Sequence, residues 1–262
     1  MANDFQGIEI LEEGIDVLCR DDPEARALAA PRHAEIISLL RRYIIEIETH
    51  NPAYGLVATA DRQELIRRHI LDSLAPLGLF CRLLKSRAID KISRIADLGS
   101  GAGLPGIPLA IAMPQVNFTL IERMGRRAGF LRGTRQALDL ANVSVIEDEL
   151  EKFAHNAAVK NSPGAACFDL LTFRAFRPLE PKILKGLFRI CAADGVLAAY
   201  KGRREKIDTE ITELEKYFAA SANRLKMPMP QIQVIPCPTP LLAEERHILL
   251  IRRTAADRVT SP

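Results

Sequence analysis

A glycine-rich stretch, DLGSGAGLPGIPLAI, extends from Asp97 to Ile111 directly after the strand-like segment ISRIA. Its first ten residues contain four glycines, which lack a Cβ, adopt positive φ readily and let the backbone approach a bound molecule closely. The apolar residues that follow have helical spacing. A strand, a glycine turn and a helix in this order are typical of sites for adenosine-containing cofactors, so the stretch predicts such a site.

Two overlapping patterns in this stretch indicate different cofactors. The glycines from Gly101 onward match GxGxxG, and Glu122 lies 21 residues further on, at the end of the next strand-like segment, where an acid binds ribose hydroxyls. That pattern indicates NAD. The pattern DxGxGxG, which begins at Asp97, indicates S-adenosylmethionine instead. Pro105 favours the second cofactor, because a proline in the first helical turn removes an N–H that a pyrophosphate would use, and a methionine sulfonium has no pyrophosphate.

Composition narrows the class of protein. The chain has 262 residues, 48% of them hydrophobic, which is enough for one main domain with an extension. Its five cysteines form no CxxC pair, so we expect reduced thiols and neither a disulfide framework nor a metal site. No apolar run approaches the roughly 18 residues of a membrane helix, and the first residues, MANDFQGIEILEEG, are acidic, unlike a signal peptide. We therefore expect a soluble, cytoplasmic protein with no membrane partner.

Strand-like and helix-like runs alternate after residue 91, which predicts an α/β fold with a doubly wound, mostly parallel sheet. The strand-like runs are 92–97, 117–122, 143–147, 168–173 and 196–201, and the helix-like runs are 104–113, 125–141, 149–156, 179–191 and 203–218. The last two strand-like runs, QIQVIP and RHILLIRR, follow one another without a helix, so we expect an antiparallel pair at the sheet edge and seven strands in all.

Apolar residues also recur every three or four positions before the sheet, in 31–50 and 64–84, which predicts amphipathic helices. We accordingly divide the chain into an N-terminal extension without assigned structure (1–30), a helical cap (31–90), the α/β domain (91–253) and a tail (254–262).

Five segments, RHILDSL, DLGSGAGLPGIPLAI, RAGFLR, FDLLTFRAF and ERHILLI, resemble in order and approximate spacing the GidB/RsmG family, bacterial methyltransferases that modify guanine N7 in 16S ribosomal RNA of the small subunit. The resemblance spans roughly residues 35 to 253. Gly55 stands where the family usually has an asparagine, and residues 1–30 have no counterpart. The resemblance implies a Rossmann-like class I S-adenosylmethionine-dependent methyltransferase, which we expect to be a monomer.

The resemblance also implies which residues contact S-adenosylmethionine, namely Gly99, Leu104, Leu150, Glu151 and Arg174. To these we add Glu122 as the ribose ligand, although a solvated acid at a strand end would look the same in sequence. An ordinary first helical turn is the alternative at Leu150 and Glu151. For Arg174 we expect a bond to the cofactor carboxylate or to an RNA phosphate, with an ion pair inside the fold as the alternative.

Guanine N7 carries a free lone pair at neutral pH, so its methylation requires no general base and we expect catalysis by positioning. Two other functions use the same features: a nicotinamide-dependent oxidoreductase with the same glycine loop, and a ribosome-assembly protein that binds RNA without catalysis. Local basic runs favour an RNA substrate, although solvated helix faces are the alternative. The candidate RNA-binding residues are Arg126, Arg127, Arg135, Arg203 and Arg204.

Few aromatic residues are available to stack on a base, and we expect Phe173, Phe176 or the plane of an arginine in that role. His69 and Asp72 lie one helical turn apart in RHILDS. We expect them to tie the cap to the sheet by hydrogen bonds, with a wall of the substrate pocket as the alternative.

Overall fold

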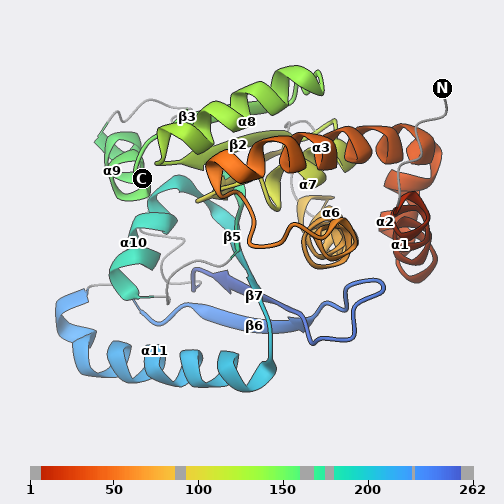
Figure 1. Cartoon of the computed structure of the whole chain (residues 1–262). Coiled ribbons are helices and arrows are strands. Elements are labelled where there is room, and N and C mark those ends of the chain that lie inside the picture. Colours follow the sequence, from red (N-terminus) through yellow and green to blue (C-terminus); the bar gives the residue numbers. More distant parts are fainter. Residues whose placement is uncertain (1–6, 86–92, 160–167, 175–179, 226–227, 255–262) are drawn as a thin grey trace, which may run out of the picture.

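The computed structural model describes residues 7–85, 93–159, 168–174, 180–225 and 228–254, with the backbone alone at 157–159 and 221–225. A twisted sheet lies at the centre, with helices on both faces (Figure 1). Residues 255–262 of the expected tail lie outside the described residues. No helix in the described ranges is long and apolar enough to cross a membrane.

The sheet has seven strands in the order β3-β2-β1-β4-β5-β7-β6. The first five are parallel, and β7 pairs antiparallel with both β5 and β6. This confirms the predicted parallel sheet and its antiparallel edge. The strands are β1 (Arg94–Leu98), β2 (Asn117–Glu122), β3 (Val143–Glu147), β4 (Phe168–Arg174), β5 (Cys191–Lys201), β6 (Gln231–Pro236) and β7 (His247–Arg252).

Helices cover the sheet in two layers, each with its own hydrophobic cluster. On one face, α7 (Gly106–Ala112) and α8 (Gly125–Ala137) lie between the sheet and α3 (His33–Tyr54). On the other face pack α9 (Leu150–Val159), α10 (Pro181–Ile190) and α11 (Arg204–Leu225). The central strand β4, FDLLTFR, is buried along almost its whole length, because both of its faces meet helices.

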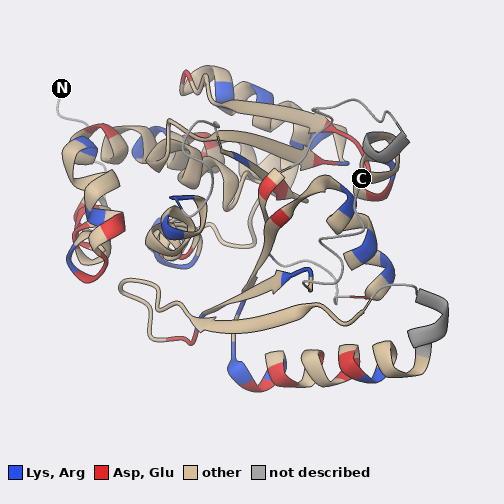
Figure 2. Ribbon diagram, turned by 180° about the vertical axis from the view of Figure 1, so that it is seen from behind, with Lys and Arg blue, Asp and Glu red and all other residues tan. Residues whose placement is uncertain are grey.

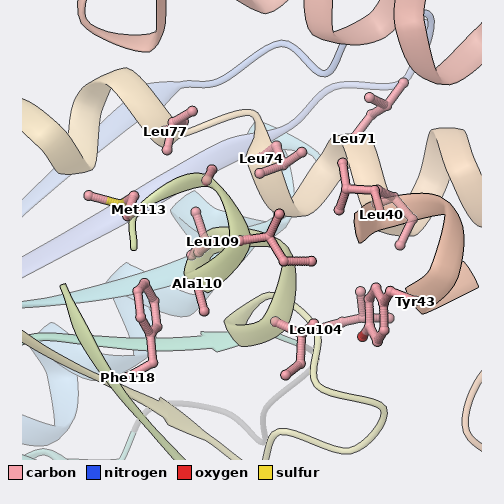
Figure 3. Packing of buried hydrophobic residues seen from close by; sticks show 14 of the residues in the cluster. Leu40, Tyr43, Leu71, Leu74, Leu77, Leu104, Leu109, Ala110, Met113 and Phe118 are labelled. Carbon is pink, nitrogen blue, oxygen red and sulfur yellow. The ribbon is translucent and has the colours of Figure 1, made fainter. Parts of the chain in front are cut away.

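The second helical stretch of the cap, for which the periodicity of residues 64–84 predicts an amphipathic helix, is divided into several short helical segments. It consists of α4 (Arg62–Leu65), a π-helical turn η2 (Ile66–Leu71), α5 (Asp72–Leu74) and α6 (Leu77–Lys85). Pro76 lies in the turn before α6, where it lacks an N–H for the helical ladder. Leu71, Leu74 and Leu77 nevertheless face α7 and α3 in one packed layer, as Figure 3 shows.

The N-terminal residues, to which the sequence assigned no structure, form α1 (Ile8–Asp21), α2 (Pro23–Ala29) and the short η1 (Ala30–Arg32). Leu11 and Ile15 of α1 are buried in the hydrophobic cluster of the cap. Gly14 of α1 lies so close to η2 that a Cβ at this position would be 2.4 Å from Cδ1 of Leu71. These helices therefore share the core of the cap.

Gly55 ends α3 with φ 58° and ψ 52°, a left-handed conformation. Glycine and asparagine are the two residues that adopt this conformation most readily after a helix. The replacement of the family asparagine by Gly55 is thus compatible with the backbone here.

Candidate functional site

A cavity of about 780 Å³ opens at the carboxyl ends of four parallel strands. The chain runs from β1 outward to β3 and then returns to β4 on the other side of β1, so the strand order reverses at this point. Such a reversal is where open α/β sheets bind their ligands. The cavity is lined by Gly99, Ile121, Glu122, Arg123, Met124, Arg127, Asp148, Glu149, Leu150, Glu151 and Arg174.

The glycine loop between β1 and α7 has a backbone that other residues adopt poorly. Gly101 and Gly103 have φ of 57° and 92°. A Cβ at Gly103 would lie 2.6 Å from Cγ1 of Ile107, inside van der Waals contact. The Gly99 N–H donates to the Ile121 carbonyl at 2.8 Å, which ties the start of the loop to β2.

Asp97, at the end of β1, lies under this loop with only 1% of its surface exposed. Its Oδ2 accepts a hydrogen bond from the Gly106 N–H at 3.1 Å, at the start of α7. Burial raises the pKa of this carboxyl from 3.8 to about 7. The Gly106 N–H at the start of α7 is therefore already engaged by Asp97 and is not available as a donor to a pyrophosphate.

Glu122 holds the other side of the glycine loop. It is 4% exposed, and its Oε2 accepts from the Gly101 N–H at 2.9 Å while Oε1 accepts from the Met124 N–H at 2.8 Å. Each carboxylate oxygen can accept a further hydrogen bond, and Glu122 lines the cavity. Its contact with a ribose stays a prediction.

The predicted cofactor residues do not all face the cavity. Gly99 lines it near β1, and Leu150 and Glu151 line it at the start of α9. The side chain of Leu104, by contrast, is 6% exposed and belongs to the hydrophobic cluster beneath the loop (Figure 3). Any contact of Leu104 with a cofactor therefore involves its backbone.

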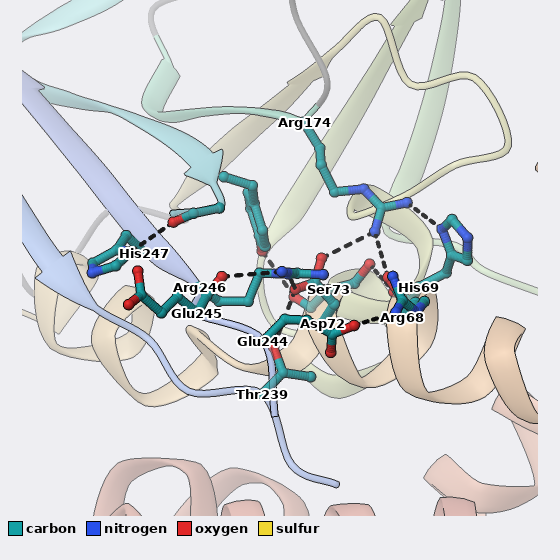
Figure 4. Close-up of polar contacts among 12 residues, drawn as sticks. Arg68, His69, Asp72, Ser73, Arg174, Thr239, Glu244, Glu245, Arg246 and His247 are labelled. Carbon is teal, nitrogen blue, oxygen red and sulfur yellow. Dashed lines mark hydrogen bonds and ion pairs between the residues drawn. The ribbon is translucent and has the colours of Figure 1, made fainter. Parts of the chain in front are cut away.

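Arg174 ends β4 and points from the cavity toward the cap (Figure 4). Its Nη1 donates to Asp72 Oδ2 at 3.1 Å and to the Arg68 carbonyl at 3.3 Å, and its Nη2 donates to His69 Nδ1 at 2.9 Å. Both Nη groups of Arg174 therefore donate to cap residues. In this arrangement the guanidinium does not offer its two Nη donors together to a cofactor carboxylate.

Asp72 connects three parts of the chain. It is 5% exposed, and besides Arg174 it accepts from Arg246 Nε at 2.9 Å and Thr239 Oγ1 at 3.1 Å. We refer to Asp72, His69, Arg174, Arg246 and Thr239 as the cap network. The expected tie between cap and sheet is present, although Asp72 and His69 make it through Arg174 and the β7 region.

His69 is neutral in this setting. Burial, followed by the nearby Arg174 charge, lowers the pKa of His69 from 6.5 to about 4. His247, at the start of β7, makes a separate contact between its Nδ1 and the Gly202 carbonyl at 2.7 Å.

A contact missed in the sequence joins the cap directly to the glycine loop. Tyr43 of α3 is completely buried, and its hydroxyl donates to the Ala102 carbonyl at 2.7 Å. In sequence Tyr43 is only one of the apolar positions of an amphipathic helix. Nothing in that pattern indicates its loop contact.

The predicted RNA-binding arginines differ in their surroundings. Arg126 and Arg135 on α8 and Arg203 before α11 are exposed, and no ion pair joins them to the described residues. Arg127 donates to the Gly55 carbonyl at 2.9 Å, and Arg204 pairs with Asp208 at 2.8 Å. The α8 and α11 arginines follow β2 and β5, which lie three strands apart, so these two sets are not adjacent.

A further basic surface, which the sequence pattern did not indicate, lies on α10. Lys182, Lys185 and Arg189 are exposed on α10, on a helix that contains no acidic residue (Figure 2). Their spacing of three and four places them on one face.

The expectation for the aromatic residues is wrong at one position. Phe173 is 1% exposed, because it faces the hydrophobic cluster under α10, and it is not available to stack on a base. Phe176 lies outside the described residues.

A family model described as rRNA small subunit methyltransferase G, GidB, matches residues 36–233. Proteins named ribosomal RNA small subunit methyltransferase G are similar over most of the chain. That of Treponema denticola is 34% identical and the match covers 84% of this chain and 88% of the relative. That of Xylella fastidiosa strain M23 is 33% identical, with 93% of each chain covered.

Solved structures with the same fold include the O-methyltransferase TomG from Streptomyces achromogenes in complex with S-adenosylmethionine. It has a TM-score of 0.53 at 15% identity, with 81% of this chain and 90% of that chain covered. A likeness at this identity concerns the fold, which is that of class I methyltransferases.

Proposed function

The chain belongs to the GidB family of rRNA small subunit methyltransferases G, and we propose that it transfers a methyl group from S-adenosylmethionine to N7 of a guanine in 16S ribosomal RNA. Enzymatic methyl transfer with this cofactor is the activity of the family. The comparisons do not support the nicotinamide-dependent oxidoreductase or the non-catalytic assembly protein. Residence in the cytoplasm and a monomeric state stay predictions.

The observation that carries this proposal is the cavity where the strand order reverses. Its lining follows the sheet in the order β3, β2, β1, β4. We propose that Leu150 and Glu151 bind the adenine, Glu122 binds the ribose, and the loop at Gly99 contacts the methionine part. S-adenosylmethionine, when bound, supplies an electrophilic methyl group on a sulfonium. The β4 end of the cavity is then the end from which guanine N7 approaches.

The residues of this chain contribute orientation and exclusion of water, because the N7 lone pair needs no proton removed. Fixing two reacting groups in line can account for about 7 to 11 kcal/mol of a barrier at best. A cation beside a base that becomes cationic would oppose the reaction. Arg174 is the cation at this end of the cavity, and its Nη1 lies 3.1 Å from Oδ2 of Asp72, which compensates the positive charge of the guanidinium.

We propose that RNA phosphates bind the exposed arginines Arg126, Arg135 and Arg203, with Arg127 and Arg204 at the same surfaces. Neutralised phosphates release counterions, so affinity should fall steeply as salt rises. Arginines on separated elements indicate a folded RNA as substrate, because a free nucleoside would contact only the cavity.

The test is methyl transfer from labelled S-adenosylmethionine to 30S subunits, naked 16S RNA, an isolated hairpin and free guanosine across a salt series. We expect N7-methylguanine in 16S RNA, strong salt dependence, and little product from guanosine. Equal efficiency on guanosine at all salt concentrations would indicate a small-molecule methyltransferase instead. Binding of S-adenosylhomocysteine but not NADH is the accompanying check on the cofactor.

A further inference from the structure

We propose that His69 donates a hydrogen bond from Nε2 to O6 of the guanine that receives the methyl group, and thereby selects guanine over adenine. This inference rests on the proposed function.

The tautomer of His69 follows from its neighbour. Nη2 of Arg174 lies 2.9 Å from Nδ1 of His69. A guanidinium has only hydrogen-bond donors, so Nδ1 must accept and the ring proton of a neutral imidazole must be on Nε2. The pKa of about 4, lowered first by burial and then by Arg174, keeps the ring neutral at physiological pH.

The Nε2–H of His69 has no partner within the described part of the chain. It is also not among the buried polar atoms that lack a partner, so it reaches solvent. His69 thus presents one unused donor, on a ring whose other nitrogen is fixed.

The place of this donor agrees with the end of the cavity assigned to the base. Arg174 lines the cavity at the β4 end, and His69 contacts the tip of Arg174 from the cap (Figure 4). Acidic residues line the opposite end, near β2 and β3, where we place the adenosine. His69 does not itself line the cavity, but it contacts Arg174, which does, and we place the guanine beyond the methionine part, next to this pair.

The chemistry of the purine edge identifies what a donor can recognise there. Guanine presents two acceptors on this edge, N7 and O6, whereas adenine presents the N7 acceptor beside an N6 amino donor. A donor on Nε2 pairs with O6 and meets a second donor if adenine enters. A site built to form such a bond rejects a base that leaves it unpaired.

The cap network fixes the segment that carries this donor, and the neutrality of the donor suits the reaction. The π-helical turn that carries His69 adjoins Asp72, which is held by Arg246 and Thr239 from the β7 side of the fold. A neutral donor also avoids the repulsion that an imidazolium would exert on a guanine ring that becomes positive on methylation.

Two matched variants test the donor. His69→Asn places an amide near the Nδ1 position, so it can still accept from Arg174, but it has no donor at the Nε2 position. His69→Gln extends an amide N–H to the Nε2 position. We measure single-turnover methyl transfer to 30S subunits, calorimetric binding of S-adenosylmethionine, and thermal unfolding.

We expect His69→Asn to transfer methyl about 10- to 100-fold more slowly, the range for one lost hydrogen bond in a closed site. Cofactor affinity should stay within about twofold, and His69→Gln should restore most of the rate. Placing 2-aminopurine, which lacks O6, at the target position should slow the parental protein by a similar factor and slow His69→Asn no further.

Parental rates for His69→Asn would overturn the inference, as would equal loss in the asparagine and glutamine variants. Weaker cofactor binding with an unchanged transfer rate would overturn it too, because the donor would then serve the cofactor. A parental protein that forms no N7-methylguanine in 16S RNA would overturn the proposed function itself. Normal parental methylation with an unaffected asparagine variant would remove the His69 inference alone.

Discussion

The two ends of the cavity are built in different ways. At the β1–β2 end, neighbouring segments hold each other through backbone groups, since Glu122 accepts from the Gly101 and Met124 N–H groups and Asp97 accepts from the Gly106 N–H. At the β4 end, charged side chains from distant segments meet in the cap network. The first end is held by hydrogen bonds from backbone N–H groups to two carboxylates, whereas at the second end two arginines share the single carboxylate of Asp72.

The largest effect on stability is expected where the shared carboxylate of Asp72 is removed. Asp72→Ala leaves Arg174 and Arg246 without their shared carboxylate in a site where Asp72 is 5% exposed. Breaking such a buried pair costs about 3 kcal/mol of unfolding free energy, at the low end of the usual range because both arginines are partly solvated.

Denaturant unfolding measures this loss. Glu244→Gln is the matched control, since it removes an exposed ion pair with Arg68 that should contribute below about 1 kcal/mol. Similar losses in the two variants would show that the cap network is no stronger than a surface pair.

At the β1–β2 end, Glu122→Ala should act on cofactor binding. The substitution leaves the Gly101 and Met124 N–H groups unpaired and removes the proposed ribose ligand, which together should weaken S-adenosylmethionine binding by about 1 to 3 kcal/mol. Titration calorimetry provides the measurement. Unchanged affinity would exclude Glu122 as a ribose ligand and as the support of the loop.

Tyr43→Phe tests whether the cap also supports the backbone-built end. The variant keeps the buried ring and loses only the hydrogen bond to the Ala102 carbonyl, so we expect cofactor affinity to fall by about 1 kcal/mol with little change in the transfer rate. Tyr54→Phe is the control, because Tyr54 is 37% exposed. A loss confined to the transfer rate would contradict a role in holding the loop.

Two further effects, opposite in sign, concern pH. The pKa of His69 is lowered to about 4, so its contribution to stability is present above pH 6.5 and is lost as pH falls toward 4. The pKa of Asp97 is raised to about 7, so its contribution is present below pH 3.8 and is lost as pH rises to about 7.

Unfolding free energies between pH 4.5 and 7.5 separate the two. The difference between the parental protein and His69→Gln should grow in favour of the parental protein as pH rises. For Asp97→Asn, which can still accept from Gly106, it should shrink. Slopes of the same sign would show that the two ends respond alike to protons.

How far the sequence predicts each end follows from the same contrast. The alternation of strands and helices, the glycine turn after β1 and the place of Glu122 at the end of β2 all come from short segments whose residue types restrict the backbone. Asp72 and Arg246 lie 174 positions apart, and no local pattern indicates that they meet. The sequence correctly predicts Arg174 at the carboxyl end of a strand. It does not predict that the guanidinium faces the cap, where the Asp72 carboxylate and the His69 imidazole accept its hydrogen bonds.

The helices α1 and α2 were missed for a related reason. Their apolar positions fit a helix, but the surface that they cover, at Leu71 and Gly78, becomes evident only when the cap is assembled. Leu104 shows the opposite case. It lies within a ligand-binding motif, but its side chain is part of the hydrophobic core.

The pairing of Asp72 with Arg246 also sets an order of events during synthesis. Ribosomes release the cap residues first, and β7 must later insert between β5 and β6 before Arg246 can reach Asp72. Contacts of such long sequence separation form late, because the intervening chain must be closed into a loop. A nascent chain that has already paired Asp72 with Arg174 therefore still lacks the second bond to Asp72, from Arg246.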